Sequence, residues 1–189
     1  MEIEILLYDG FDDLDVFGPV EVLHAGGLAA RLVTLEPAAV VTSAAGVRVE
    51  PHSLLGDPPL LIVPGGGWST RAPRGAWAEA QRGEIPRMLA ERHRAGRRLA
   101  AVCTGGMLLA AAGLLRGRTA ITHHSAIADL AAYGADVVSG ARVVDAGDVV
   151  TSGGVTSGID LALAIVARER GQNIAAAVAS EIEYPWAPS

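Results

Sequence analysis

The chain has 189 residues, of which 50% are hydrophobic and 19% are charged, and its formal net charge is −6. This composition fits one compact α/β unit with a full core, and the acidic balance argues against a nucleic-acid platform, which needs a basic face to neutralise phosphates. All 15 basic residues are arginine, which excludes chemistry that depends on lysine, such as a Schiff base, a pyridoxal phosphate anchor or a Walker A loop.

The sequence also bears on where the protein works. Its one cysteine cannot form an intrachain disulfide, and the acidic start MEIEILLYDG lacks the basic-then-apolar layout of a signal peptide. No apolar run approaches the roughly 18 residues of a membrane-spanning helix. We therefore expect a cytoplasmic protein that contacts neither membrane nor nucleic acid.

The first elements in chain order are a strand, a helix and a second strand. The apolar run IEILLY (3–8) predicts a buried strand. The segment DLDVFGPVEVLHAGG (13–27) predicts a helix with Pro19 in its first turn and with Gly26 and the glycine after it as its stop. The run AARLVTLE (29–36) predicts the second strand.

The middle of the chain continues the alternation. Residues 40–51 have two β-rich halves around a small-residue turn, which predicts a hairpin. The run 59–67 predicts a buried strand that leads into a glycine loop, and 75–95 predicts a polar helix. The run LAAV (99–102) predicts a further buried strand, and the helix GGMLLAAAGLL (105–115) follows the cysteine.

The last part of the chain predicts short strands and three helices. These are a strand over RTAIT, a helix over SAIADLAAYG, short strands in ADVV, ARVVDAG and DVVTSGG, and helices over VTSGIDLALAIVARERG and QNIAAAVASEIEY. Strands that alternate with helices predict an α/β protein with a doubly wound, mostly parallel sheet and helices on both faces. We expect a single domain over 1–189, with a short tail at about 185–189.

Cys103 stands at the junction between an apolar run and a glycine-opened helix. A residue on a sharp strand-to-helix turn is forced outward and needs small neighbours, which Ala101 and Gly105 provide. The helix start points free N–H groups and its positive dipole end at the sulfur, which lowers a thiol pKa. We expect Cys103 to be an ionised nucleophile; the alternative is a small buried apolar side chain.

The glycine triplet after the strand at 59–63 is a second candidate, because ligands bind outside the carboxyl ends of strands in open α/β sheets. Glycines let backbone N–H groups face a pocket without obstruction. The N–H of Gly66 or Gly67, with that of Thr104, is a candidate site for a developing negative charge. A tight turn is the alternative.

Asp15 is the candidate proton carrier. It lies between two apolar residues, so we expect its side chain to point inward. A carboxyl group beside a thiolate has a raised pKa and carries a proton at neutral pH. Glu21, further along the same segment, is its rival.

His123 and His124 suggest a metal site, but neighbours on an extended segment point to opposite faces, and no further His/Cys set has ligand spacing. We expect no metal. One of the two histidines is a candidate base or hydrogen-bond partner for the thiol, and a solvent-facing or capping role is the alternative. Trp68 and Phe17 are candidate pocket residues, with a loop cover and a core position as their alternatives.

Four segments together resemble the ThiJ/PfpI superfamily over about residues 3–183: DGFDDLDVFGPVEVL, LLIVPGGGWSTR, AVCTGGMLLAAAGLLRGRTAITHH and VVTSGGVTSGIDLALAIVARERG. Within it, the LDxxGPxEVL segment and C-T-G in place of C-H-G are similar to the isonitrile hydratase branch and to the amidase-like halves of some AraC-type regulators.

The resemblance implies a flavodoxin-like fold of the class I glutamine amidotransferase type, a homodimer, and a cofactor-independent enzyme that hydrates an isonitrile to an N-substituted formamide. It implies that Cys103 is the nucleophile, that Asp15 and Thr104 assist it, and that Gly66 or Gly67 supplies an oxyanion contact. His123 matches a histidine near the thiol in glyoxalase-type relatives. Our candidate dimer surface is the low-charge first helix, with Val20, Val22 and Leu23; helix core is the alternative.

The chain departs from other members of the superfamily at two positions. Thr104 stands where protease-like members have histidine, and Asp15 stands where glyoxalase-type members use a glutamate. The remaining alternatives are a redox or stress sensor whose cysteine oxidises, a ligand-binding module without turnover, and a glyoxalase or deglycase-type lyase.

Overall fold

A seven-stranded sheet forms the centre of the computed structural model, which describes residues 1–187. All strands of this sheet run parallel except one edge strand, β10. Their order is β10 (Val143–Asp145), β11 (Val149–Ser152), β7 (Arg98–Ala101), β6 (Leu60–Val63), β1 (Ile3–Leu7), β2 (Ala30–Thr34) and β5 (Ser53–Leu54). The predicted α/β class and mostly parallel sheet are confirmed.

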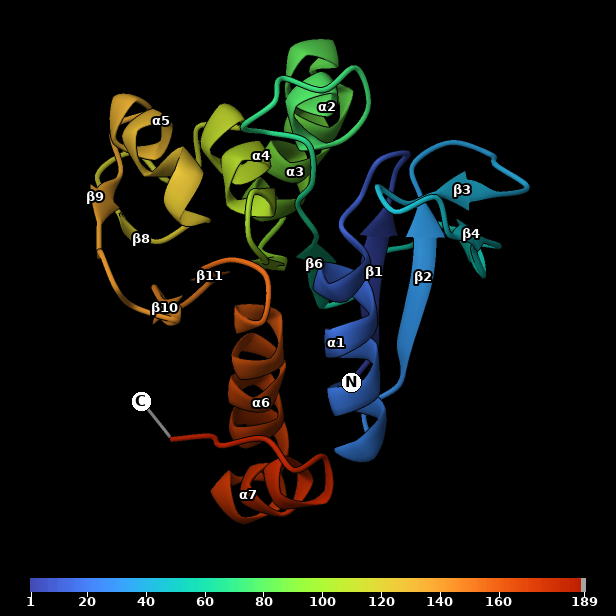
Figure 1. The fold of residues 1–189 in the computed structure, drawn as a ribbon, viewed down its shortest axis with the longest axis vertical. Helices are drawn as coiled ribbons and strands as arrows, with labels where there is room; N and C mark the ends of the chain where they lie inside the picture. Colours follow the sequence, from blue (N-terminus) through green and yellow to red (C-terminus); the bar gives the residue numbers. More distant parts are fainter. Residues whose placement is uncertain (188–189) are drawn as a thin grey trace.

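Helices cover both faces of this sheet (Figure 1). The connection from β1 to β2 and the connection from β6 to β7 run in opposite directions along the sheet, so right-handed crossovers place their helices on opposite faces. One group contains α1 (Asp13–Ala25), α6 (Ser157–Arg170) and α7 (Gln172–Glu181), which pack on one another. The other contains α2 (Ala76–Arg82), α3 (Glu84–Arg94) and α4 (Gly105–Ala111).

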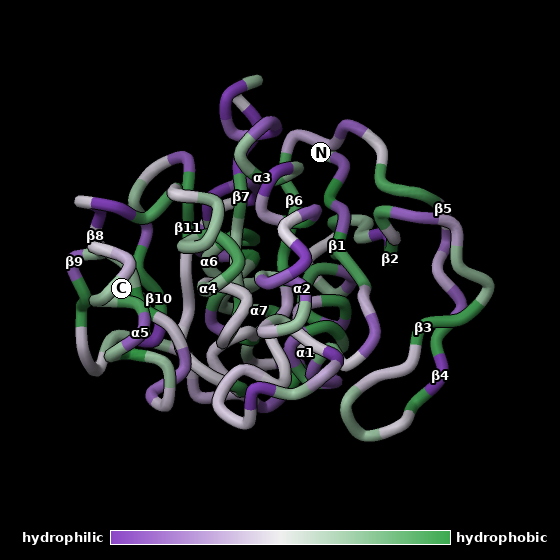
Figure 2. Tube along the Cα trace, turned by 90° about the horizontal axis from the view of Figure 1, so that it is seen from above, coloured by the Kyte–Doolittle hydropathy of each residue, from purple (hydrophilic) through white to green (hydrophobic). Residues whose placement is uncertain are grey.

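The central strands are buried on both faces, as expected for a sheet between two helical layers. Every residue of β1 and of β6 is buried. Figure 2 shows these strands, together with β7, as a largely hydrophobic band inside the molecule. The parallel register brings the carboxyl ends of β6 and β7 together, with Val63 opposite Ala101.

Two small sheets lie outside the main one. The antiparallel pair β3 (Val41–Thr42) and β4 (Arg48–Val49) confirms the predicted hairpin. The parallel pair β8 (Thr119–Ala120) and β9 (Asp136–Val137) flanks a 3₁₀ turn at His124–Ala126 and the short helix α5 (Ile127–Ala132). Within residues 1–187, no helix is both long enough and apolar enough to cross a membrane.

Two helix predictions are wrong. Pro19 does not lie in the first turn of α1, because the Asp12 side chain caps the helix by accepting a hydrogen bond from Leu14 N–H, and the helix starts at Asp13. Proline has no N–H, so the carbonyl of Asp15, four residues earlier, loses its intrahelical partner. The predicted helix 75–95 is two helices, because Gly83 adopts a left-handed φ of 81° between α2 and α3.

The suggested dimer surface on α1 also needs correction. Val22 and Leu23 lie in the hydrophobic core, since α1 packs against α6, and Val20 is half-buried against the same core. The predicted tail is coil at Pro185–Ala187, and residues 188–189 lie outside the described residues.

Candidate active site

Cys103 lies on the sharp turn between β7 and α4, as the sequence predicts. Its φ is 55°, a left-handed value that a residue with a side chain adopts only when its surroundings hold it there. The Cys103 N–H donates to the Gly153 carbonyl at 3.1 Å, and Thr122 Oγ1 donates to the Cys103 carbonyl at 2.8 Å. These two bonds fix the peptide groups on either side of the sulfur-bearing carbon.

The turn leaves no room for larger neighbours. A Cβ atom on Gly105 would lie 2.2 Å from the carbonyl oxygen of Val63, and one on Gly65 would lie 2.5 Å from the backbone nitrogen of Thr104. Both contacts are shorter than real Cβ atoms show, and both are with backbone atoms. The close approach of β6 and its loop to the start of α4 therefore requires glycine at both positions.

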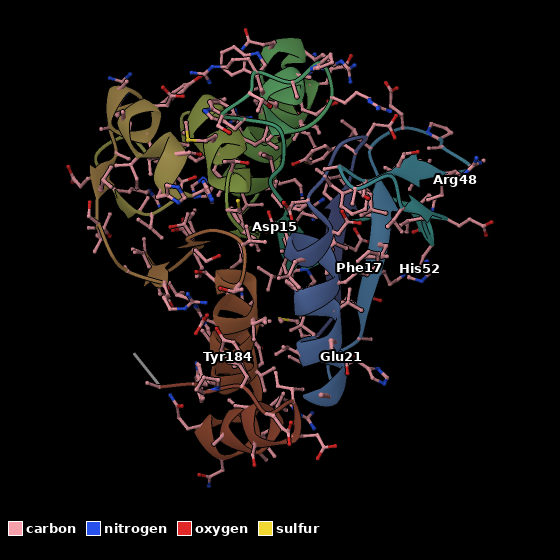
Figure 3. The ribbon with its side chains drawn as sticks, viewed as in Figure 1. Asp15, Phe17, Glu21, Arg48, His52 and Tyr184 are labelled. Carbon is pink, nitrogen blue, oxygen red and sulfur yellow. The ribbon has the colours of Figure 1, made fainter. Side chains whose placement is uncertain are left out.

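Asp15 reaches this turn from the first turn of α1. Its side chain is fully buried, and Oδ2 accepts a hydrogen bond from Gly65 N–H at 2.9 Å. Oδ1 is buried with no hydrogen-bond partner in the described part of the chain. Figure 3 shows Asp15 near the end of α1 that faces the strand ends and Glu21 further along the helix, where Glu21 is exposed. The geometry favours Asp15 over its rival.

Burial raises the pKa of the Asp15 carboxyl to about 8 from an ordinary value of 3.8. The negative charge of Asp12 adds to the rise, and the donors Gly65 N–H and Cys103 act in the opposite direction. A carboxyl group with this pKa carries a proton at pH 7, as the sequence predicts. The main cause is loss of solvent.

The predicted ionised thiol at Cys103 is wrong for the resting protein. Burial raises the thiol pKa well above its ordinary value, and the charge of Asp15 raises it further. The N–H and the hydroxyl of Thr104 act in the opposite direction but are outweighed. The helix dipole at the sulfur is also small, because α4 has only seven residues. The Cys103 side chain is 5% exposed, so water stabilises a thiolate there very little. At neutral pH the thiol and the carboxyl are both protonated.

Thr104 connects the glycine loop to the sulfur. Its Oγ1 accepts a hydrogen bond from Gly66 N–H at 2.9 Å, and its own donors favour the ionised form of Cys103. The N–H of Gly66 is therefore already bonded, which is unfavourable for its predicted role as an oxyanion donor. Gly67, with a φ of 66°, lines a cavity of about 360 Å³ next to the β3–β4 hairpin.

Tyr8 is a buried group that the sequence did not single out. It follows β1, and its hydroxyl donates to the carbonyl of Pro64, directly before the glycine loop. Burial raises its pKa well above the ordinary value, and the charges of Asp15, Glu79 and Cys103 add to this. Tyr8 thus stays a neutral donor, and its hydrogen bond to Pro64 holds the start of the glycine loop. Its only signal in the sequence was its place at the end of the apolar run 3–8.

The two histidines do not point to opposite faces as expected, because β8 ends at Ala120 and the chain turns at His124. Their ring centroids are 4.1 Å apart. His123 contacts Ser125 through Nδ1, and burial lowers its pKa. His124 lines a cavity of about 460 Å³ beside the strand-to-helix turn at Cys103, which we call the elbow. The other cavity-lining residues include Thr122, Arg142, Gly153 and Ser157.

Trp68 and Phe17 have different positions. Trp68 is 2% exposed and packs edge-on against Trp77, so it is a core residue and does not line an open pocket. Phe17 is 38% exposed on α1 and contacts Phe11 edge-on at 6.4 Å between centroids. In Figure 3, Phe17 and Asp15 are labelled on opposite sides of α1.

The mostly parallel doubly wound sheet defines a flavodoxin-like α/β protein. Its candidate site combines a cysteine on the strand-to-helix turn, a buried carboxyl and a glycine loop. The sequence pattern of the DJ-1/PfpI family matches residues 1–168, and the chain belongs to this family.

Particular relatives resemble it over nearly the whole chain. Isonitrile hydratase of Pseudomonas putida is 32% identical over 191 residues, which cover 100% of this chain and 80% of the relative. The crystal structure of a ThiJ/PfpI family protein from Pseudomonas syringae superimposes with a TM-score of 0.85 at 32% identity, over 99% of this chain and 76% of that one. Drosophila melanogaster DJ-1beta has a TM-score of 0.84 at 20% identity, over 98% of both chains, and shares the fold.

Proposed function

We propose that this protein is an enzyme that hydrates an isonitrile to an N-substituted formamide through a covalent bond to Cys103. The observation that carries the proposal is the fully buried Asp15 carboxyl, with a pKa of about 8, held by Gly65 next to the thiol. The 32% identity with an isonitrile hydratase over the whole chain supports the choice of substrate class.

The reactive form is the pair after the loss of one proton. The carboxyl, with a pKa of about 8, loses its proton before the thiol does. As the substrate enters, the carboxylate takes the proton of the thiol, which leaves a thiolate beside a protonated Asp15. The sulfur attacks the terminal carbon of the isonitrile, and the same carbon takes the proton from Asp15. A C–S and a C–H bond form, the Asp15 O–H bond breaks, and the product is a thioimidate beside an ionised carboxylate.

Hydrolysis uses the carboxylate as a base. Asp15 takes a proton from a water molecule, the water oxygen attacks the thioimidate carbon, and the proton passes on to the nitrogen. The tetrahedral species then collapses. Its C–S bond breaks, its hydroxyl proton goes to Asp15, and a formamide leaves while Cys103 is regenerated as the thiolate. The sum is one isonitrile and one water converted to one formamide, with no metal or organic cofactor.

Thr104 assists both steps in this proposal. Its N–H and hydroxyl stabilise the sulfur when it is negative, both before attack and when it leaves. Gly66 N–H orients the Thr104 hydroxyl, so Gly66 acts through Thr104. Gly67 remains our candidate for a direct contact with the substrate nitrogen.

We also propose that the enzyme acts as a homodimer. The exposed apolar side chains Leu14 and Phe17, three residues apart, lie on one face of α1, and a second copy would remove them from water. Sedimentation of the wild type and of a Phe17→Glu variant tests this. A monomeric wild type at micromolar concentration would contradict it.

Turnover of cyclohexyl isocyanide, followed by ¹H NMR of the formamide proton, tests the function. Asp15→Asn should lower kcat by about 10² to 10⁴, the range for removal of a general acid or base. Glu21→Gln, the same change at an exposed site on the same helix, should leave kcat unchanged. A wild type that is inactive on a panel of alkyl and aryl isonitriles would sink the proposal.

A further inference from the structure

Two side chains that follow the glycine loop donate hydrogen bonds to one carboxylate oxygen of α5. Asp129 Oδ2 on α5 accepts from Trp68 Nε1 at 2.7 Å and from Arg71 at 2.8 Å. The Arg71 guanidinium also stacks on Trp77 of α2, with its carbon 3.9 Å from the ring centroid. We call Trp68, Arg71 and Asp129 the Asp129 cluster.

This cluster joins two segments that are distant in sequence and that both touch the elbow. The glycine loop contacts Thr104, because Gly66 N–H donates to Thr104 Oγ1 and Gly65 lies against its backbone. The segment that precedes α5 contacts Cys103, because Thr122 Oγ1 donates to the Cys103 carbonyl. Figure 1 shows α4, which starts at the elbow, between α2 and α5. The Asp129 carboxylate on α5 links these two segments through its hydrogen bonds to Trp68 and Arg71.

Trp68 has few alternatives to this arrangement, whereas the side chains of Arg71 and Asp129 are 45% and 35% exposed. The Trp68 side chain is buried, so its indole N–H needs an acceptor inside the protein, and Asp129 is the one present. The backbone of Arg71 has a left-handed φ of 51°, which a residue with a side chain adopts only when held. Hydrogen bonds from Trp68 and Arg71 lower the pKa of Asp129, so the carboxylate stays charged at neutral pH.

We propose that Asp129 is a positioning residue for the candidate active site. It fixes the loop through Trp68 and Arg71, so that Gly65 N–H stays on Asp15 and Gly66 N–H stays on Thr104. It touches neither the sulfur nor the carboxyl of Asp15. The inference builds on the proposed function, but its test does not need the substrate.

The test is the rate at which iodoacetamide alkylates Cys103, measured by intact mass from pH 6 to pH 10. Asp129→Ala removes both bonds and should release the loop, so that the thiol reacts at least about tenfold faster. Asp129→Asn keeps one amide oxygen as an acceptor and should fall between wild type and Asp129→Ala. Trp68→Phe keeps the ring but not the N–H and should also react faster.

Asp57→Asn is the matched control. Asp57 precedes β6 and pairs with Arg97, which precedes β7, so the pair lies at the amino ends of these strands while the elbow lies at the carboxyl end of β7. This pair also joins two segments. It should alter thermal stability without a change in the alkylation profile. If Asp129→Ala fails to fold, Trp68→Phe and Arg71→Ala carry the test.

The two possible failures are distinguishable. Alkylation profiles of the Asp129 and Trp68 variants that match the wild type, or that are slower, would overturn the positioning role whatever the substrate. Faster alkylation together with no isonitrile turnover by the wild type would keep the positioning role and remove the proposed function.

Discussion

Replacing Asp15 by asparagine should change how the stability of the protein depends on pH. Asparagine has the size of a protonated aspartate, and its carbonyl oxygen can still accept the Gly65 N–H. Its amide group does not titrate, so the variant isolates the effect of the buried carboxyl. The amide N–H₂ takes the place of Oδ1, which has no partner within residues 1–187, and this adds a pH-independent penalty of about 1–3 kcal/mol.

The sign and size of the pH effect follow from the raised pKa. Below pH 3.8 the folded and unfolded chains both hold the proton, and the contribution of the Asp15 carboxyl to the free energy of unfolding is fully present. Between 3.8 and about 8 only the unfolded chain releases it, so the free energy of unfolding falls by about 1.4 kcal/mol per pH unit. From pH 5 to pH 7 the wild type should therefore lose roughly 3 kcal/mol that Asp15→Asn keeps.

The assay is urea unfolding followed by circular dichroism at half-unit steps from pH 5 to pH 9. The difference in free energy of unfolding between variant and wild type should rise with pH and level off above about 8. Asp136→Asn, at an exposed position in β9, serves as the control and should show no such slope. A difference that stays constant from pH 5 to pH 7.5 would mean that Asp15 is ionised in the folded protein and would refute the reasoning.

Three further predictions concern the elbow and the surface. Gly65→Ala places a Cβ atom 2.5 Å from Thr104 N, so we expect a loss of roughly 1–3 kcal/mol in thermal unfolding together with loss of turnover; a variant with wild-type activity would contradict the close approach. Because the carboxyl–thiol pair loses its first proton near pH 8, kcat/KM for an isonitrile should rise with pH through about 8, and a profile already flat at pH 6 would be inconsistent with a protonated pair. Arg118 and His93 lower the pKa of Asp148 to about 2, but its side chain is 47% exposed, so Asp148→Asn should cost less than about 1 kcal/mol at pH 7. The stabilisation by Asp148 is fully present above pH 3.8 and disappears as the pH falls through about 2, which thermal unfolding at pH 7 and pH 2 measures.

The position of Cys103 could be predicted from the sequence because the signal is local. A short apolar run, a lone cysteine and two glycines specify a strand, a sharp turn and a helix within a few residues. The φ of 55° confirms the turn. The protonation state could not be predicted in the same way, because it depends on burial by α1 and the glycine loop, which come from other parts of the chain.

The choice between Asp15 and Glu21, and the place of Trp68, show the same limit. Both carboxylates occur in one helix, and the rotation of α1 against α6 decides which is buried. Trp68 directly follows the glycines, which suggested a pocket residue. Its hydrogen-bond partner is Asp129, 61 residues later, and nothing in the local sequence indicates that contact.

The most direct test of the mechanism is a single-turnover experiment with enzyme in excess over cyclohexyl isocyanide carrying ¹³C at the isocyanide carbon. With the wild type, the label should pass into N-cyclohexylformamide, and Cys103→Ala should form it at least a thousandfold more slowly. Equal rates of formamide formation in the two proteins would show that the sulfur forms no bond to the substrate.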